Sequence, residues 1–402
     1  MSLIKAKPKE AWAFPESSPA RLGFSETRTQ RLLNVLNSEI ERKRLPGAVV
    51  LIARHGKLAL FEALGRQDPQ QGTPMARDSI FRIYSMTKPL VSVAVMLLVE
   101  QGLLLLHEPV SRYLPEYAGQ KLGVEQSGQL VLQDVAKPPT VQDLLRHTAG
   151  LAYDFSGGLV AQEYARARLN WRERSNEEFS KLVGGLPLMH PPGTVWEYSR
   201  ATDVLGRLVE ALSGQSLGDF LQRHIFEPLG MKDTAFSVPP AQHARIAEPF
   251  AQDPDGGEPF PMIDIRTAPK FESGGGGLAS TAMDYARFLQ FMLNKGELGG
   301  MRLLGPHTVA FMTADHLGTR PTIGPLVPPG HGFGLGFAVR RELGLAHIPG
   351  SVGSYYWGGI AGTTFWVDPE QDMFALMMIQ APNQRDYYRP MFRNLVYAAL
   401  VD

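Results

Sequence analysis

The chain has 402 residues, 44% of them hydrophobic, which is enough for one large or two medium-sized domains. Lysine plus arginine and aspartate plus glutamate both number 40, and this balance argues against nucleic acid or an anionic membrane as the main partner. The absence of cysteine excludes disulfides, thiolate metal sites and a cysteine nucleophile. Because residues 1–24 lack the apolar stretch of a secretory signal and no apolar run is long enough for a membrane span, we expect a soluble cytoplasmic protein.

The N-terminal part predicts a helix followed by a β-hairpin. Apolar residues recur at helical spacing within 25–45. Two apolar runs, 48–54 and 57–64, are then separated by His55-Gly56, a pair typical of a tight turn. We therefore interpret His55 as a turn residue and not as a ligand.

The next segment places a serine and a lysine at the start of a very apolar helix. Residues 91–99 are almost all apolar, and Gly102 follows them where a helix ends. We expect Ser85 to be the N-cap of this helix, with Lys88 three residues later on the same face. Since an amine beside a hydroxyl can make a serine nucleophilic, Ser85 and Lys88 are catalytic candidates. The alternative is a helix cap plus a surface lysine.

The context of this Ser-x-x-Lys pattern favours the catalytic interpretation. A strand-like run, 79–83, leads directly into the apolar helix, so Lys88 is expected to be at least partly buried. A buried lysine needs a partner or a shifted pKa. The same pattern occurs at Ser2 and Lys5, where we assign it no function.

The middle of the chain is mainly helical in pattern. A polar insert at 118–139 contains one alternating run, and residues 159–184 look helical. His147 is a second catalytic candidate, although we favour a structural role. Tyr198 follows a proline-rich loop and directly precedes a helix, which holds a side chain firmly; the alternative is a buried structural tyrosine.

Ser216 is the rival nucleophile, because residues 214–218 match Gly-x-Ser-x-Gly. A nucleophile elbow must follow a strand, whereas the segment before Gly214 has helical periodicity. Asp219 lies three residues after Ser216, as in a capping box. We therefore interpret Ser216 as a helix N-cap.

The C-terminal third returns to strands. The glycines at 274–277 lack the ending of a phosphate-binding loop and indicate close backbone packing near a pocket. Residues 237–272 are proline-rich and irregular. Strands are expected at 332–340, 355–359, 363–367 and 373–379, followed by a helix at 389–401. This order predicts one sheet assembled from both ends of the chain, with a helical domain inserted between them.

Three pieces occur in order along the chain: Ser85-Met86-Thr87-Lys88, Tyr198-Ser199-Arg200 and Trp357-Gly358-Gly359. With the segment 147–151 and the four glycines, the chain from about Arg21 onward resembles the serine β-lactamase-like superfamily. Within it, the chain is most similar to family VIII carboxylesterases, which resemble class C β-lactamases and D-Ala-D-Ala peptidases. The resemblance implies an α/β domain with an antiparallel sheet flanked by N- and C-terminal helices (20–80 and 275–402), a mainly helical domain (81–274), and an active site in the groove between them.

The resemblance also implies roles for individual residues. Ser85 would be the acylated nucleophile, and Lys88 would activate both Ser85 and Tyr198. Tyr198 would act as general base and later protonate the leaving group. Backbone amides of Ser85 and Ile360 would form the oxyanion hole, which agrees with what acyl transfer requires. No cofactor or metal is implied.

Two departures from class C β-lactamases bear on the substrate. Arg200 stands where those enzymes carry an asparagine, and Trp357 replaces the lysine that faces the β-lactam carboxylate. Losing such a charge-assisted contact typically costs about 2 kcal/mol. With Trp357, Gly358 and Gly359 as substrate-binding residues, we expect neutral and fairly apolar esters rather than penicillins.

The resulting hypothesis is a serine carboxylesterase that cleaves short- to medium-chain neutral esters, small molecules, through an acyl-serine intermediate with a Ser-Lys-Tyr centre. An acyltransferase differs only in that an alcohol, not water, takes the acyl group, so the residues leave both activities open. Weak β-lactamase or D-amino-acid peptidase activity is a further alternative, and a non-catalytic binding protein is the last. The residues do not specify an oligomeric state.

Overall fold

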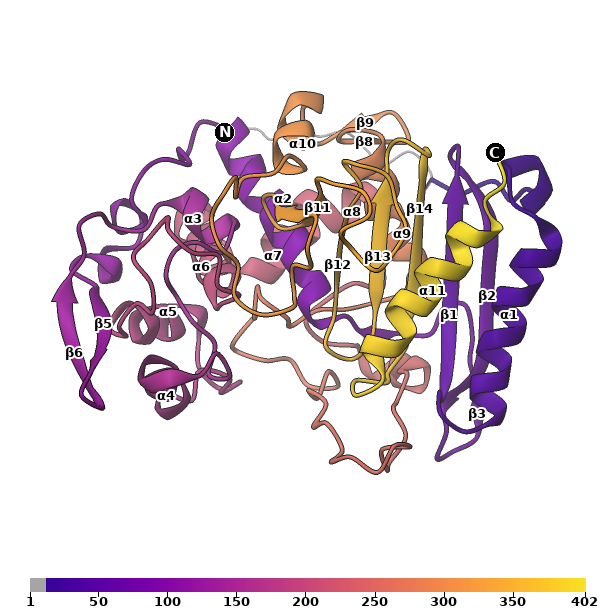
Figure 1. The fold of residues 1–402 in the computed structure, drawn as a ribbon, viewed down its shortest axis with the longest axis horizontal. Helices are drawn as coiled ribbons and strands as arrows, with labels where there is room; N and C mark the ends of the chain where they lie inside the picture. Colours follow the sequence, from indigo (N-terminus) through magenta and orange to yellow (C-terminus); the bar gives the residue numbers. More distant parts are fainter. Residues whose placement is uncertain (1–11) are drawn as a thin grey trace.

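The computed structural model describes residues 12–402, so the second Ser-x-x-Lys pattern and the first part of the segment examined for a secretory signal lie outside the described residues. Within that range the central feature is an eight-stranded sheet with the order β10-β11-β12-β13-β14-β1-β2-β3 (Figure 1). Neighbouring strands are antiparallel throughout. The strands are β1 (Gly47–Arg54), β2 (Lys57–Asp68), β3 (Thr73–Pro74), β10 (His331–Phe333), β11 (Ala338–Arg340), β12 (Tyr355–Gly358), β13 (Thr364–Asp368) and β14 (Met373–Met378).

The two ends of the chain meet where β1 pairs with β14, with Leu51 opposite Leu376. This pairing confirms the prediction of one sheet built from both ends. His55 and Gly56 have φ angles of 52° and 69° and form the turn between β1 and β2, so His55 is a turn residue as expected.

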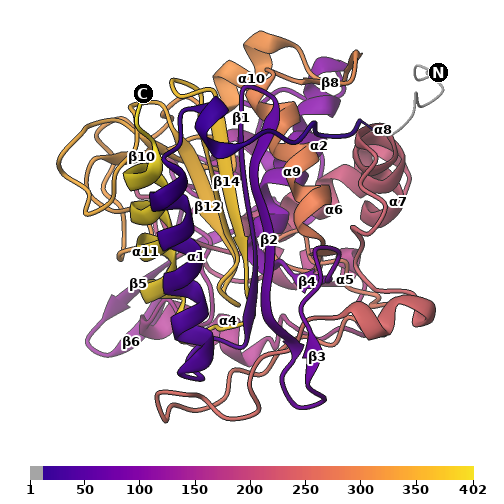
Figure 2. The same ribbon diagram turned by 90° about the vertical axis from the view of Figure 1, so that its right-hand side faces the viewer.

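Alternating side chains of β1 point to opposite faces of the sheet and into two different cores. Val50 and Ile52 pack with residues of α1 (Glu26–Glu41) and α11 (Arg385–Ala399), which lie side by side over one face (Figure 2). Val49 and Leu51 point the other way, toward α2 (Thr87–Glu100) and α9 (Ala282–Leu293). This layering follows from the period-two alternation of a strand and confirms the predicted fold class.

The start of α2 differs from the prediction. Ser85 is not the N-cap: it lies in a 3-10 turn, η2 (Tyr84–Met86), and Met86 occupies the cap position. The backbone at Ile83 and Met86 is already helical, whereas a capping side chain requires an extended residue. The Ser85 hydroxyl is therefore not used to cap the helix. At the other end, Gly102 has a φ of 71° just after α2, as expected of a terminating glycine.

The middle of the chain carries most of the remaining helices. They are α3 (Val141–Leu145), α4 (Gly158–Arg166), α5 (Asn176–Gly184), α6 (Ala201–Ser213), α7 (Leu217–Leu221) and α8 (Glu227–Leu229), with α10 (Pro306–Met312) further on. The short strands β4 (Phe81–Arg82) and β7 (Ala279–Ser280) pair with each other, as do β8 (Glu297–Leu298) and β9 (Met301–Arg302).

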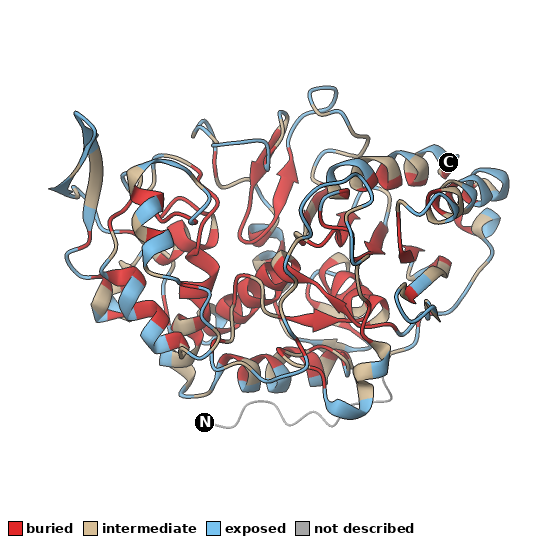
Figure 3. Cartoon of the chain, turned by 90° about the horizontal axis from the view of Figure 1, so that it is seen from below, coloured by how far each residue is buried: buried red, intermediate tan, exposed pale blue. Residues whose placement is uncertain are grey.

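Two predictions for this region need correction. The polar insert forms a complete hairpin of β5 (Lys121–Gln126) and β6 (Gln129–Asp134), which lies largely exposed at one end of the molecule (Figure 3). The expected helix at 159–184 is two helices, because residues 167–175 leave the helical path and Arg168 has a φ of 47°. The division into domains at 20–80, 81–274 and 275–402 stays a prediction.

None of the helices within residues 12–402 is both long enough and apolar enough to cross a bilayer.

Candidate active site

The Ser85 hydroxyl is contacted by two side chains, one from the next helical turn and one from a distant loop. The Tyr198 phenol donates a hydrogen bond of 2.7 Å to Ser85 Oγ, and Lys88 Nζ donates one of 3.3 Å to the same oxygen. Ser85 itself is only half-buried, so a substrate can reach its oxygen. A nucleophile within hydrogen-bond reach of a base is the arrangement that nucleophilic catalysis needs.

Local strain helps to position Ser85. Tyr84, the residue directly before it, has a φ of 42°, which is unfavourable for a bulky side chain. Tyr84 is buried, and its hydroxyl accepts a 2.9 Å hydrogen bond from the amide of Ile263. This packing holds the strained backbone that presents Ser85 at the turn before α2.

Lys88 is almost fully buried, and all three N–H groups of its ammonium donate hydrogen bonds. Its Nζ donates to the hydroxyl of Tyr153 at 3.1 Å and to the carbonyl oxygen of Gly275 at 2.7 Å, in addition to Ser85. An ammonium group has three N–H donors, so each is satisfied. Lys88 is therefore oriented by two fixed partners while the third N–H points at Ser85.

The charge on Lys88 is held in place by its surroundings. Burial lowers the pKa of Lys88, but Tyr153, Tyr198 and the Asp203 carboxylate raise it by more, so the pKa lies above its ordinary value. Lys88 is thus an ammonium ion at neutral pH. Its positive charge favours any negative charge that develops on the adjacent oxygens.

Tyr153 and Asp203 are two site residues that the sequence did not reveal. Tyr153 accepts from Lys88, and burial raises the pKa of its phenol to about 12, so it stays neutral. Asp203 Oδ1 accepts from Ser273 Oγ at 2.6 Å and from the amide of Gly275 at 2.9 Å. Asp203 thereby fixes Gly275, the residue whose carbonyl oxygen accepts from Lys88.

The glycine run explains how this contact is made. A Cβ atom at Gly274 would lie 2.6 Å from the carbonyl oxygen of Thr202, and one at Gly275 would lie 2.7 Å from Asp203 Oδ2. The backbone can approach α6 this closely only without side chains. The interpretation of these glycines as close backbone packing near the site is therefore correct.

The end of β12 lies against the turn that carries Ser85. A Cβ at Gly359 would clash with the carbonyl oxygen of Ile83, two residues before Ser85. This contact places Gly359, the residue before Ile360, directly against the turn that carries Ser85. Neither the amide of Ser85 nor that of Ile360 donates to a backbone carbonyl within residues 12–402, so both are available to a substrate oxygen.

Arg389 of α11 supports this loop and was also missed from the sequence. Its Nη2 donates to the carbonyl oxygens of Gly359 and, at 3.3 Å, of Thr363. Burial lowers the pKa of the guanidinium to about 10, so Arg389 remains charged at neutral pH. Its cation holds the carbonyls on either side of Ile360.

Trp357 forms an aromatic wall beside the base. Its ring centre lies 5.4 Å from that of Tyr198 and 5.3 Å from that of Phe333. The side chain is 5% exposed, and its indole N–H has no hydrogen-bond partner within the described part of the chain. Trp357 therefore offers apolar surface and one free donor where related enzymes carry a cation.

The two other candidates have structural positions. His147 is buried, its ring lies 5.0 Å from the Tyr198 ring, and its Nδ1 lies 3.2 Å from Ser199 Oγ. Burial and the charge of Lys88 lower the pKa of His147 well below its usual range, so it is neutral. Ser216 accepts from the amide of Asp219 at 3.1 Å and caps α7, as predicted.

Residues 12–402 contain no cluster of three or more histidine, aspartate or glutamate side chains suited to holding a metal ion.

Comparison with known proteins defines the class to which this fold and site belong. Residues 30–398 match the Beta-lactamase family, and the chain is a member of that family. Among curated proteins, Esterase EstB from Burkholderia gladioli is 32% identical over 375 residues, which cover 87% of this chain and 89% of EstB. The resemblance inferred from the three motifs is therefore confirmed.

Solved structures show the same fold over nearly the whole chain. EstCE1, described as a hydrolase with promiscuous acyltransferase activity, has a TM-score of 0.77 and 28% identity and covers 92% of this chain and 99% of its own. Simvastatin synthase (LovD) from Aspergillus terreus has a TM-score of 0.76 and 26% identity and covers 93% of this chain and 99% of its own. These similarities confirm the β-lactamase/transpeptidase-like fold.

Proposed function

We propose that this protein is a serine carboxylesterase that works through an acyl-Ser85 intermediate with Lys88 and Tyr198. The observation that carries this proposal is the 2.7 Å hydrogen bond between the Tyr198 phenol and Ser85 Oγ, with Lys88 Nζ 3.3 Å from the same oxygen. The similarity to Esterase EstB and EstCE1 supports ester hydrolysis or acyl transfer as the reaction class.

In the acylation step, the active form has lost one proton from the Lys88–Tyr198 pair, which leaves the phenolic oxygen as base beside the ammonium ion. Ser85 Oγ attacks the ester carbonyl carbon while its proton passes to Tyr198. The bond from that carbon to the alcohol oxygen then breaks, and Tyr198 returns the proton to the departing alcohol. The acyl group is left on Ser85.

In the deacylation step, water attacks the acyl carbon and gives its proton to Tyr198. The bond to Ser85 Oγ breaks, the proton returns to that oxygen, and a carboxylic acid is released. In both steps the amides of Ser85 and Ile360 would stabilise the oxyanion, a contribution worth about 10²- to 10³-fold in rate for one donor in other enzymes.

The substrate side of the proposal rests on Trp357. The side chain places an aromatic surface and no cation next to Tyr198, so the part of the ester that meets it is neutral and apolar. Short- to medium-chain esters fit this description better than β-lactams, whose carboxylate would lose its charged partner there. We further propose that the groove holding Ser85 lies between the 81–274 segment and the two segments that build the sheet.

Acyl transfer to an alcohol is the second candidate, favoured by the same relatives. EstCE1 is described as having acyltransferase activity, and Acyltransferase calJ from Penicillium decumbens is 28% identical over 81% of this chain. The partition of the acyl group between water and an added alcohol separates the two activities. A dominant transfer product at low alcohol concentration identifies an acyltransferase.

Labelling with a fluorophosphonate followed by peptide mapping tests the proposal. The label should appear on Ser85, and Ser85→Ala should abolish it. Ser216→Ala is the matched control: it should retain the label and lose up to about 2 kcal/mol of stability as a missing helix cap. A label on Ser216, or none on the folded protein, would contradict the proposal.

A further inference from the structure

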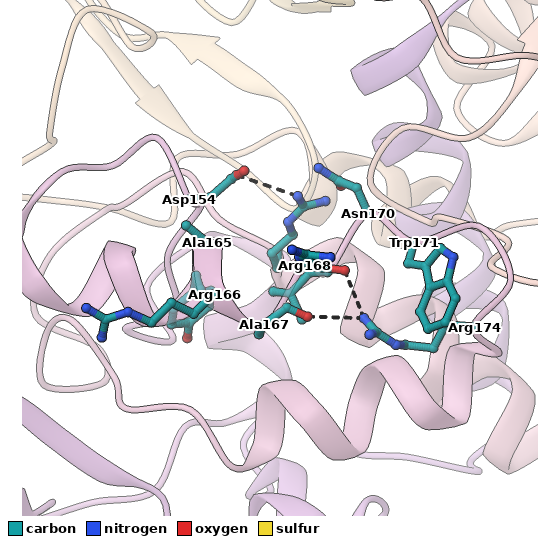
Figure 4. A pocket seen from close by; sticks show the side chains of 11 residues that line it. Asp154, Ala165, Arg166, Ala167, Arg168, Asn170, Trp171 and Arg174 are labelled. Atoms are coloured by element: carbon teal, nitrogen blue, oxygen red, sulfur yellow. Dashed lines mark hydrogen bonds and ion pairs between the residues drawn. The ribbon is translucent and has the colours of Figure 1, made fainter.

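A cavity of about 520 Å³ lies beside the catalytic centre, where the chain leaves the helical path between α4 and α5 (Figure 4). Residues of that segment form most of its wall, and Asp154 and Arg200 complete it. The lining residues are Asp154, Tyr164, Ala165, Arg166, Ala167, Arg168, Leu169, Asn170, Trp171, Arg174 and Arg200. The volume is in the range of sites that hold small organic ligands.

The charges around this cavity are strongly unbalanced. Four arginines line it, against one carboxylate, Asp154. Arg174 is occupied, because its Nη1 donates to the carbonyl oxygens of Ala167 at 3.4 Å and Arg168 at 3.0 Å (Figure 4). Arg166 pairs with Glu163, which lies outside the lining. The positive charge left on Arg168 and Arg200 favours an anion in the cavity.

Arg200 is the cavity residue whose hydrogen-bond donors most clearly lack acceptors. Its side chain is 8% exposed, yet its guanidinium makes no hydrogen bond within residues 12–402, and Nε is buried without a partner. Asp154 and Asp203 each lie 3.7 Å from a guanidinium nitrogen, beyond hydrogen-bond distance. Arg200 therefore has two long ion pairs but no hydrogen bond for the five donors of its guanidinium, and a buried charged group without hydrogen bonds is costly.

The neighbouring carboxylates pair with Arg200 without forming a hydrogen bond: Asp203 Oδ2 lies 3.7 Å from Arg200 Nη1 and has no hydrogen-bond partner within the described residues. Asp203 Oδ1 already accepts from Ser273 and from the Gly275 amide. Asp154 is 41% exposed and is free to turn toward solvent. A ligand carboxylate in the cavity would supply two acceptor oxygens in the geometry that arginine binds in a bidentate manner.

One aromatic ring separates Arg200 from the reacting groups. The guanidinium carbon lies 4.6 Å from the centre of the Tyr153 ring, and the hydroxyl of that ring accepts from Lys88. Phe155 stacks on the same ring at 4.7 Å and is 66% exposed. A substrate that reaches both Ser85 and Arg200 has to pass Tyr153 and Phe155, so the part between its two ends is expected to be apolar.

We propose that the cavity at Arg200 binds a carboxylate at the far end of the ester substrate. The substrate class is then a half-ester of a dicarboxylic acid, neutral where it meets Trp357 and anionic where it meets Arg200. This inference rests on the proposed esterase function and assigns Arg200 as a specificity-determining residue.

The test compares two p-nitrophenyl esters of equal chain length, one ending in a carboxylate and the other in its neutral methyl ester. For a series of chain lengths, kcat/KM of the carboxylate ester relative to the neutral ester is measured. The wild-type ratio should rise by about tenfold or more at the length that reaches Arg200. Arg200→Gln should remove this rise, and Arg200→Lys should keep part of it.

Two further variants make the result specific. Arg168→Asn removes a second cavity cation at a position whose positive φ asparagine tolerates, and it should reduce the ratio by a smaller factor. Arg223→Gln removes an exposed arginine outside the cavity and should leave the ratio unchanged. A ratio that is flat at every length, or one that Arg200→Gln leaves intact, overturns the inference.

The remaining outcomes separate this inference from the proposed function. If neither ester is turned over, the proposed function fails; the inference is then decided by calorimetric titration of Ser85→Ala with pimelate, which should bind and should lose binding in Ser85→Ala/Arg200→Gln. If free butyrate accelerates hydrolysis of the neutral ester without competing with the carboxylate ester, the cavity is a separate anion site and the substrate assignment is overturned.

Discussion

The Tyr198 hydroxyl and Ser85 Oγ lie 2.7 Å apart although 113 positions separate the two residues in the chain. The loop before α6 carries the phenol and the turn before α2 carries the hydroxyl. The two elements make this contact because α2 and α6 pack against each other. The chemistry of the site therefore depends on a tertiary contact and not on the local Ser-x-x-Lys pattern.

Tyr198→Phe tests this contact. The variant keeps the ring that packs on Trp357 and His147 but removes the phenolic oxygen that we propose takes the Ser85 proton. We expect kcat to fall by about 10²- to 10⁴-fold with little change in melting temperature. Steady-state kinetics with a neutral ester, alongside thermal unfolding, checks both parts. Activity within a few fold of wild type would show that another group is the base.

Asp203→Asn tests how Lys88 is held. In the wild type the Asp203 carboxylate helps to raise the pKa of Lys88, and its oxygen fixes the Gly275 peptide. We expect kcat to fall by about tenfold to 10²-fold as the site loosens, with KM less affected.

The pH profile distinguishes this role from a general loss of stability. Activity of the wild type should rise as the pH becomes alkaline, because the Lys88–Tyr198 pair must lose one proton and its surroundings hold the pKa of Lys88 above its ordinary value. Without the negative charge of Asp203 the pKa of Lys88 is lower, so the rise should move to lower pH. Asp219→Asn, an exposed substitution on α7, should leave the profile in place. An unshifted profile in Asp203→Asn would refute the electrostatic part of this account.

Gly359→Ala tests the oxyanion loop. The added Cβ would meet the carbonyl oxygen of Ile83, and the loop must move away from Ser85 to accommodate it. We expect a fall of about 10²-fold in kcat, the usual effect of losing one oxyanion donor. Gly185→Ala is the control, because a Cβ there meets only ordinary contacts of 3.5 Å or more. Equal kinetics for the two variants would exclude Ile360 from the oxyanion hole.

The burial of His331 predicts that the protein loses folding stability at acidic pH. Burial, together with the charge of Arg340, lowers the pKa of His331 to about 4. As the pH falls from about 6.5 to 4, the imidazole of His331 is protonated in the unfolded chain but stays neutral in the folded protein. The free energy of unfolding therefore decreases over this pH range. After allowance for partial solvent screening, the loss should be up to about 2 kcal/mol.

The measurement is the free energy of unfolding at pH 7 and at pH 4.5 for His331→Asn and the wild type. Asparagine can still donate to the carbonyl of Pro329, which lies 3.2 Å from His331 Nδ1, but it cannot titrate. The variant should lose less stability between the two pH values. His55→Asn, at an exposed turn, should behave like the wild type. An identical acid loss in all three proteins would assign the loss to other groups.

The sequence predicted the three residues that the structure brings together at Ser85 Oγ, but it did not predict the residues that hold them in place. Ser85, Lys88 and Tyr198 each occupy a local context with a recognisable pattern: a strand-to-helix junction, one helical turn, and a proline-held loop. Tyr153 and Asp203 have no such pattern, because their roles come from contacts to Lys88 and to the glycine run that only the fold creates.

The errors have equally local causes. Ser85 was expected as an N-cap because serine is a strong capping residue, but the 3-10 turn before α2 already supplies helical backbone there. The second strand of the 118–139 hairpin fits an alternating pattern, whereas the first contains Gly123 and exposed charges that conceal it. The significance of Arg200 depends on its burial, which a single arginine in the sequence does not indicate.

The central claim is tested most directly by stopping the reaction with acid during turnover of a neutral ester and measuring the mass of the active-site peptide. The account predicts an added acyl group on Ser85 in the wild type and none in Ser85→Ala. In Tyr198→Phe, the amount of acyl-Ser85 divided by the turnover rate should be larger than in the wild type. Turnover that persists in Ser85→Ala, or an acyl group found on Ser216, would contradict it.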